Sequence, residues 1–213
     1  MTTNHRGATL VATIGAPGAG KSTWRTRWCE ANPHAVVVNL DRMRAAVSWC
    51  GCLMNQAASP YALELATVAA SAALAADRVV LWDATSADVA ARRRLLVLAA
   101  EHGARTVAVV HQPPVATVLA RNAARSAKRC ACGHARRVPT DVVLDKHAAI
   151  EAAVPSLAEE GWHVVTIAQN RRGEEPAFPV EWGAPVTAHQ PRERHSSRCG
   201  RCSPSVESSP WPG

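Results

Sequence analysis

The feature that most restricts this chain is the stretch Gly15–Ser22, which reads GAPGAGKS. It satisfies the phosphate-binding loop (P-loop) pattern, in which two spaced glycines are followed by lysine and serine. The apolar run before it predicts a β-strand and the residues after it predict a helix, which is the context that the pattern requires. Glycines let the backbone curl so that successive N–H groups point at a phosphate near the positive end of that helix. The motif therefore predicts a nucleotide-binding α/β domain.

Two side chains of the loop have separate tasks in such a site. Lys21 places a positive charge on the β- and γ-phosphate oxygens, and the Ser22 hydroxyl is a ligand for Mg²⁺. ATP and Mg²⁺ are therefore the expected cofactors. The residues expected to contact the nucleotide phosphates are Gly15, Ala16, Pro17, Gly18, Ala19, Gly20, Lys21, Ser22 and Thr23.

Short apolar runs rich in β-branched residues alternate with longer helical patterns over most of the chain. Continuous apolar runs of this kind are typical of strands buried on both faces of a parallel sheet. The pattern predicts an α/β P-loop NTPase fold, a three-layer αβα domain with a five-stranded parallel sheet and a helical lid. The five strands are expected at residues 8–14, 35–40, 78–83, 105–111 and 163–168.

Helix boundaries can also be placed from capping residues. Ser59 opens one helix, Ser86 caps a second that ends near Gly103, and Pro139 or Thr140 starts a third.

The composition changes beyond about residue 169, where seven of the 14 prolines lie among serines and arginines. We expect residues 1–168 to form the P-loop domain, with its lid at about residues 113–138, and residues 169–213 to be a partly disordered tail. No run approaches the roughly 20 apolar residues of a membrane-spanning helix. The first apolar run leads straight into the P-loop, so we expect a cytoplasmic protein with no membrane partner.

The sequence argues against two classes of P-loop protein. No Asn-Lys-x-Asp motif is present to read guanine, and Asp83 is followed by Ala84 where motor ATPases carry a water-activating glutamate. After the second strand, Asp41 can accept a proton from an attacking hydroxyl, and Arg44 can grip an acceptor phosphate. These features predict phosphoryl transfer to an acceptor other than water.

The net charge of +7 is concentrated in one segment. Residues 121–137 contain six basic side chains and no acidic one. Such a patch indicates a polyanionic partner or a clamp on a triphosphate. The basic residues are Arg121, Arg125, Lys128, Arg129, Arg136 and Arg137.

Several stretches together resemble the phage-type polynucleotide 5′-hydroxyl kinases and their bacterial relatives, which have an AAA_33-like ATP-binding kinase domain. They occur in the order and spacing of that family over about residues 8–168, and read GAPGAGKSTW, LDRMR, VVLWDATS, RNAAR and RVPTDVV. The resemblance implies that the γ-phosphate of ATP is moved to a 5′-hydroxyl of DNA or RNA with Mg²⁺. Nucleic-acid 5′ ends are then the expected partners. The sequence carries no phosphatase or ligase module of the kind that some relatives append.

The resemblance also implies residue roles. Asp41 looks like the general base and Arg44 like the ligand of the acceptor's 3′-phosphate. Asp83 would hold the metal or order the site, although Ser86 stands where the family has asparagine.

In the same way, Arg121 and Arg125, expected one helical turn apart on one face, resemble lid arginines that stabilise charge on the migrating phosphoryl group. The implied catalytic residues are Lys21, Asp41, Arg44 and Arg125, the metal ligands are Ser22 and Asp83, and Arg121 contacts the nucleotide.

The seven cysteines indicate reduced thiols or a metal more than disulfides. An insertion in the lid, CACGH, contains Cys130, Cys132 and His134, and the tail contains Cys199 and Cys202. Together they could form a Cys₄ or Cys₃His zinc site that pins the tail across the lid. The alternative is two unrelated pairs of reduced thiols.

Three other cysteines, Cys29, Cys50 and Cys52, are expected to pack. Two other functions also fit the sequence. One is a kinase of a small hydroxyl compound such as a nucleoside, sugar or antibiotic, and the other is a nucleotide-binding module without transfer activity.

Overall fold

The computed structural model describes residues 7–168, which contain a single parallel sheet. The predicted tail lies outside the described residues. The strand order is β2-β3-β1-β4-β5, and every neighbouring pair is parallel. This confirms the predicted P-loop fold, with each strand within about a residue or two of its expected place. The strands are β1 (Thr9–Gly15), β2 (Val36–Asn39), β3 (Val79–Asp83), β4 (Arg105–His111) and β5 (Val164–Ile167).

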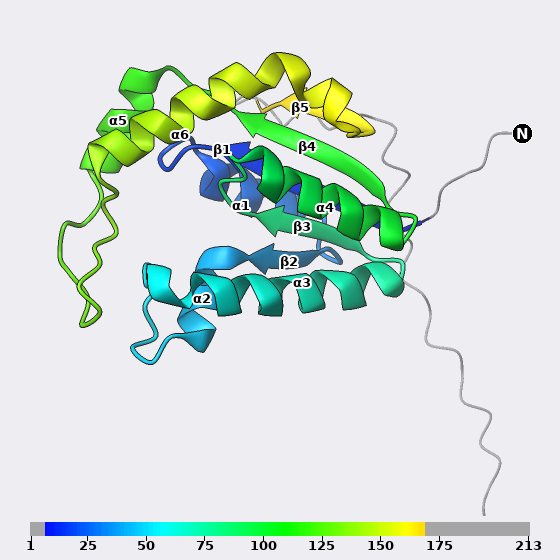
Figure 1. Cartoon of the computed structure of the whole chain (residues 1–213), viewed down its shortest axis with the longest axis horizontal. Coiled ribbons are helices and arrows are strands. Elements are labelled where there is room, and N and C mark those ends of the chain that lie inside the picture. Colours follow the sequence, from blue (N-terminus) through cyan, green and yellow to red (C-terminus); the bar gives the residue numbers. More distant parts are fainter. Residues whose placement is uncertain (1–6, 169–213) are drawn as a thin grey trace, which may run out of the picture. The chain divides into compact units, whose positions relative to one another are not determined.

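Helices cover both faces of the sheet and make the three expected layers (Figure 1). The helices are α1 (Lys21–Ala31), α2 (Leu40–Val47), α3 (Ser59–Ala75), α4 (Val89–Glu101), α5 (Val115–Ala123) and α6 (Thr140–Ala153), with 3₁₀ turns η1 (Gln56–Ala58) and η2 (Val154–Glu160). The larger core lies where α3, α4 and α6 pack on one face. On the other face, α1 packs through the stacked rings of Trp24 and Trp28. Among the described helices, none is long and apolar enough to cross a membrane.

Strand β1 occupies the centre of the sheet, and every residue from Leu10 to Gly15 is buried. It pairs with β4 along its whole length, so that Gly15 lies opposite His111 at the carboxyl ends of the two strands. A Cβ at Gly15 would lie 2.8 Å from the Cβ of His111. Only glycine lets the P-loop leave the sheet at this point without displacing β4.

The prediction that Ser86 caps a helix is wrong, because α4 begins three residues later. Ser86 is buried with a positive φ of 46°, and its carbonyl accepts a hydrogen bond from Arg92 Nη1 at 3.2 Å. Asp88, with extended backbone, directly precedes α4, and its carbonyl accepts the Arg92 N–H. The predicted start of α3 at Ser59 and of α6 at Thr140 are confirmed.

A buried ion pair joins α4 to the segment before β5. Arg92 is fully buried, and its Nε and Nη2 donate to the two carboxylate oxygens of Glu160 at 2.8 and 2.5 Å. Its Nη1 donates to the carbonyls of Ser86 and Ala87. Burial by itself would raise the pKa of Glu160, but the hydrogen bonds and charge of Arg92 lower it overall. No hydrophobic pattern signals this arginine, which lies on a helix with two further arginines beside it.

We expect Glu160→Gln to lower the free energy of unfolding by about 3 kcal/mol at neutral pH, because it leaves the buried guanidinium without its counter-charge. Since the folded-state pKa of Glu160 is lowered, the ionised carboxylate stabilises the folded protein at neutral pH. This stabilisation is lost as pH falls below the ordinary glutamate range. The difference between wild type and variant should therefore narrow in acid. Urea unfolding over a pH series measures this, with exposed Glu159→Gln as the matched control. Equal losses for the two variants would contradict the assignment.

Candidate active site

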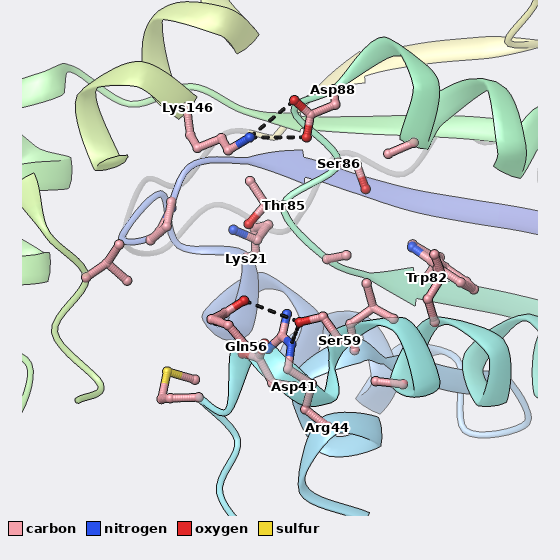
Figure 2. Close-up of a pocket in the computed structure, with 18 of the residues that line it drawn as sticks. Lys21, Asp41, Arg44, Gln56, Ser59, Trp82, Thr85, Ser86, Asp88 and Lys146 are labelled. Atoms are coloured by element: carbon pink, nitrogen blue, oxygen red, sulfur yellow. Dashed lines mark hydrogen bonds and ion pairs between the residues drawn. The ribbon is translucent and has the colours of Figure 1, made fainter. Parts of the chain in front are cut away.

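A cleft of about 1280 Å³ lies at the carboxyl ends of the central strands. Parallel α/β sheets bind ligands at this edge. The P-loop, α2, α3, α4 and the segment after α5 all contribute to its lining. In Figure 2, Lys21 lies between the Asp41–Arg44 pair on one side and the Asp88–Lys146 pair on the other. The structure thus brings the predicted donor and acceptor residues to one cleft.

The P-loop has the features of a phosphate cradle. Helix α1 starts without a side-chain cap, after Gly20 in a left-handed conformation with φ of 101°. The first N–H groups of such a helix have no partner within the helix and favour an anion. The ammonium of Lys21 donates to the loop's own carbonyls, at 2.6 Å from Gly15 O and 3.1 Å from Ala16 O. The residues present therefore fit a bound polyphosphate, toward which Lys21 can turn.

Burial lowers the pKa of Lys21 to about 8. The carboxylate of Asp83 opposes this effect, the guanidinium of Arg125 adds to it, and Asp41 opposes it weakly. The ammonium is thus held where its charge is poorly solvated, which favours its pairing with phosphate oxygens.

Ser22 and Asp83, the two predicted metal ligands, have different surroundings. Ser22 lines the cleft and would hold the Mg²⁺ that the fold implies. Asp83 is buried, and its carboxylate pairs with Arg25 and accepts from Asn39 Nδ2 at 2.7 Å and from Thr13 Oγ1 at 3.4 Å. These contacts favour the ordering role for Asp83 over direct metal binding.

Arg25 was not identified from the sequence. It lies one turn after Lys21 on α1, which is the spacing that brings it to the same carboxyl edge as Asp83. That spacing is the only signal that the sequence offers for it.

On the acceptor side, Asp41 and Arg44 form an ion pair within α2. Asn39 caps this helix by accepting the N–H of Arg42 at 2.8 Å, which fixes its start at the end of β2. Arg44 also donates to Ser59 Oγ at 3.1 Å and to the carbonyl of Leu53 at 3.0 Å. Arg44 is therefore anchored, while the carboxylate of Asp41 is half exposed in the cleft. An exposed pair of this kind is weak and can open for a substrate.

The predicted lid arginines do not share one helix. Helix α5 ends at Ala123, so Arg121 is helical and Arg125 lies beyond the end, which corrects the expected placement of both on one helical face. The cause is Asn122, whose buried amide donates to the carbonyl of Val138 at 2.8 Å and accepts its N–H at 3.2 Å. These two bonds turn the chain away from the helix and close the lid as a loop.

Both arginines nevertheless reach the site. Arg121 Nη1 lies 3.5 Å from the carbonyl of Gly18 at the tip of the P-loop. Arg125 lines the cleft, and partial burial, followed by the charge of Arg136, lowers its pKa. The loop between them and α6 is stabilised by Arg137, whose Nε donates to the carbonyl of Arg125 at 3.1 Å.

His111 and Trp24 form a support beneath the P-loop that the sequence analysis did not identify. The two rings meet edge-to-face with centroids 5.5 Å apart. Burial, and then the charge of Lys21, lower the pKa of His111 to about 3, so the imidazole is neutral. A neutral ring here avoids a second positive charge beside Lys21.

The cysteines of the lid meet partners other than those predicted. The sulfur atoms of Cys130 and Cys132 lie close to those of Cys50 and Cys52, which were expected to pack. His134 is not part of this group. The other predicted zinc ligands, Cys199 and Cys202, lie outside the described residues. Cys29, on α1, packs against the smaller core cluster, as expected.

We expect the affinity for ATP to fall as pH rises above about 8, because binding requires the Lys21 ammonium and the free protein loses that proton in this range. A bound triphosphate raises the pKa of Lys21, so affinity is insensitive to this group below about pH 8 and falls by up to about tenfold per pH unit above it. Calorimetric titration at a series of pH values measures the effect. Lys21→Met should bind weakly without this inflection, and a flat wild-type curve up to about pH 10 would contradict the prediction.

Gly18→Ala should weaken ATP binding by about tenfold or more. A Cβ at Gly18 would lie 2.6 Å from the carbonyl of Val118, so the tip of the P-loop would have to move away from α5. Gly161 has a similar positive φ, 103° against 99°, with nothing within 4 Å of an added Cβ. Gly161→Ala therefore reproduces the backbone strain, about 1 kcal/mol, without the clash. ATP binding and urea unfolding of both variants are compared, and equal losses of binding would contradict the role of this contact.

The geometry agrees with comparisons to known proteins. Among solved structures, the chain is similar to one in the Pnkp1/Rnl/Hen1 RNA repair complex, with a TM-score of 0.62 and 20% identity over 73% of this chain and 48% of that one. A second structure of that complex gives a TM-score of 0.51 and 23% identity over 60% of this chain and 43% of that one. A shikimate kinase from Acinetobacter baumannii gives 0.45 and 16% identity, covering 78% of this chain and 86% of that one.

This chain thus covers less than half the length of the chains it matches in the repair complex. At these identities the likeness shows the fold alone. No curated protein sequence matches this one.

The family model AAA_33, described as an AAA domain, matches residues 10–153 of the 213. This range includes the P-loop, the Asp41–Arg44 pair, Asp83 and the lid arginines. The chain belongs to the AAA_33 family and has a P-loop kinase fold, which implies ATP and Mg²⁺ as its cofactors.

Proposed function

We propose that this protein is an ATP-dependent polynucleotide 5′-kinase that transfers the γ-phosphate of ATP to a 5′-hydroxyl of DNA or RNA. One observation carries the proposal: Lys21 and the Asp41–Arg44 pair line the same cleft, whose lining has eight lysines and arginines against three carboxylates. Such an excess of positive charge favours an acceptor that carries several phosphates.

The donor half of the reaction uses the P-loop. Lys21 leaves the carbonyls of Gly15 and Ala16 and pairs with oxygens of the β- and γ-phosphates, and the N–H groups at the start of α1 bind the same phosphates. Ser22 would hold Mg²⁺, which would supply positive charge to the phosphates. Asp83, fixed by Arg25 and Asn39, keeps the strand end and α1 in register beside this site.

The acceptor half uses α2. An incoming phosphate of the nucleic acid takes the guanidinium of Arg44, which frees the carboxylate of Asp41. Asp41 then accepts the proton of the 5′-hydroxyl as its oxygen forms a bond to the γ-phosphorus, and the bond to the leaving ADP breaks. The bonds from Arg44 to Ser59 and Leu53 keep the guanidinium in place while its partner changes.

The lid supplies charge opposite the transferring group. Arg125 lines the cleft and Arg121 lies against the P-loop tip, so both can stabilise the charge that develops on the phosphoryl oxygens. Arg129 and Arg137 also line the cleft from this side and extend the positive wall. They can contact phosphates of the acceptor beyond its terminal nucleotide.

The similar chain in the RNA repair complex supports RNA as the first acceptor to examine, since that chain shares the fold. A small hydroxyl compound in the same cleft is the main alternative. It would need Arg44 for at most one phosphate and would leave Arg129 and Arg137 without a ligand.

Asp41→Ala should reduce transfer from γ-labelled ATP to a 5′-hydroxyl oligonucleotide by about 10²–10⁴-fold, the usual contribution of a positioned general base. ATP binding should be largely kept, because Asp41 does not belong to the P-loop. Glu64→Ala, an exposed carboxylate on α3 outside the cleft, is the control and should transfer normally. Unchanged transfer by the Asp41 variant would remove this residue from the chemistry.

The same assay separates the two classes of acceptor. With an oligonucleotide acceptor, KM should rise steeply with salt, because several phosphate contacts are screened together. A panel of nucleosides, sugars and aminoglycosides provides the comparison. Transfer to a panel compound, with none to DNA or RNA oligonucleotides at low salt, would replace the proposed function by the small-molecule alternative.

A further inference from the structure

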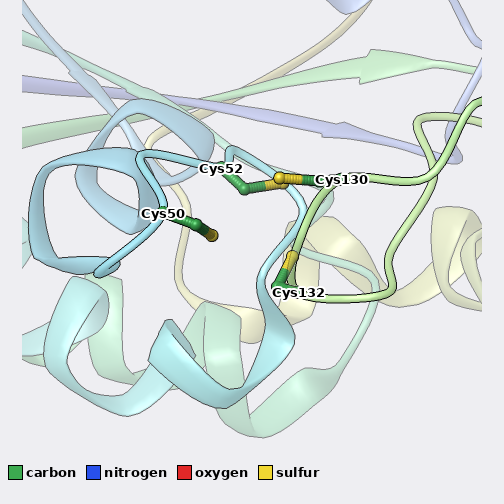
Figure 3. A group of neighbouring side chains, drawn as sticks. All are labelled: Cys50, Cys52, Cys130 and Cys132. Carbon is green, nitrogen blue, oxygen red and sulfur yellow. The ribbon is translucent and has the colours of Figure 1, made fainter.

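Four cysteines from two distant parts of the sequence meet beside the cleft. Cys50 and Cys52 lie in the loop between α2 and α3, and Cys130 and Cys132 lie in the loop between α5 and α6. Their four sulfur atoms all lie within 4.8 Å of one another. Figure 3 shows the side chains converging on the space between the two loops. Figure 1 shows these loops next to each other at one end of the domain.

The α2–α3 loop is shaped around its two sulfur atoms. Asn55 Nδ2 donates to Ser48 Oγ at 2.7 Å, which leaves the Ser48 hydroxyl hydrogen free to point at Cys50 Sγ, 3.3 Å away. The N–H of Met54 donates to Cys52 Sγ at 3.3 Å. Donors directed at sulfur stabilise a thiolate, which is the form that binds metal ions.

The second loop is a tight hairpin. The N–H of Cys130 donates to the carbonyl of His134, and the N–H of Gly133 donates to the carbonyl of Cys130, both at 2.9 Å. Gly133 has a positive φ of 80°, and Arg129 pairs with Ala135 across the hairpin. This compact turn presents Cys130 and Cys132 toward the first loop. The hairpin contains the insertion CACGH, and its two cysteines do not line the cleft.

We propose that Cys50, Cys52, Cys130 and Cys132 bind one structural Zn²⁺ that fastens the lid hairpin to the α2–α3 loop. Zinc bound by four thiolates is tetrahedral with Zn–S bonds of about 2.3 Å, which places the sulfur atoms about 3.8 Å apart. The sulfur–sulfur distances therefore need to shorten by at most about 1 Å. Four sulfur ligands in a closed shell are typical of structural zinc. The site is independent of the proposed function.

The metal would connect the two sides of the cleft. Leu53, between Cys52 and Met54, accepts a hydrogen bond from Arg44 at 3.0 Å. On the other side, Arg129 and Gly133 of the hairpin line the cleft. A metal that holds the four sulfur atoms in place would also hold the Leu53 carbonyl, which accepts from Arg44. It would likewise hold Arg129 and Gly133, which line the cleft. Nothing else among the described contacts joins these two loops covalently or by an ion pair.

Elemental analysis of the full chain, purified without chelators or a metal-binding tag, tests the proposal. We expect about one zinc per chain. Cys52→Ser and Cys132→Ser should each lose most of it. Cys29→Ser and the double variant Cys199→Ser/Cys202→Ser should keep it, because Cys29 packs against the core from α1 and the tail cysteines are not needed for the four-sulfur group.

Two measurements on the wild-type chain keep the test decisive where a variant fails to fold. Exchange with Co²⁺ should give the strong visible absorption of a tetrahedral thiolate complex. Removal of zinc should increase trypsin cleavage after Lys128 and Arg129, which precede Cys130 in the hairpin.

Three results would overturn the proposal. The first is wild-type protein that neither contains zinc nor takes it up, and the second is iron or disulfide bonds at these cysteines in place of zinc. The third is loss of zinc only when the tail cysteines are replaced. Cleavage unaffected by zinc removal would contradict the fastening of the hairpin.

Discussion

The parallel pairing of β1 with β3 on one side and β4 on the other is the constraint on which the site depends. It places Gly15 opposite His111 and brings Thr13 to Asp83, so the P-loop must start where only a glycine fits. The same pairing brings Asp83 within reach of Arg25 on the helix that the P-loop opens. The register of the sheet, the P-loop and α1 therefore depend on one another: the register sets Gly15 against His111, and the Arg25–Asp83 pair ties α1 to β3.

The electrostatics of the cleft follow from this arrangement. Removing the Lys21 ammonium from water is costly, and the lowered pKa of Lys21 reflects that desolvation. The carboxylate of Asp83 stabilises the Lys21 ammonium, and His111 is neutral and so adds no second positive charge. The lid adds guanidinium groups from a segment without acids. The cleft is therefore prepared for a highly charged anion, as a kinase fold requires.

The lid shows how a short polar contact can redirect a chain. The spacing of Arg-Asn-x-x-Arg predicts two arginines on one face of a helix, and a helix continued to Arg125 would place Arg121 and Arg125 there. Instead the Asn122 amide forms two bonds to Val138, and the chain leaves the helix at Ala123. Paired hydrogen bonds of a buried amide outweigh the modest helix propensity of one more turn. The resulting loop is long enough to bring Cys130 and Cys132 to the α2–α3 loop.

The sequence by itself determined the parallel α/β fold, the strand positions and the P-loop, because buried β-branched runs and a glycine-rich motif are local patterns. It also placed Lys21, Asp41 and Arg44 on the cleft, since the carboxyl ends of parallel strands share one edge. It could not show Arg25, Arg92 or His111 in their contacts, because charge pairing and ring packing between distant segments leave no periodic signal. Only the tertiary structure decided which cysteines meet. Cys50 and Cys130 are 80 residues apart in the chain, and loop closure brings together sulfur atoms whose spacing gives no indication of their partners.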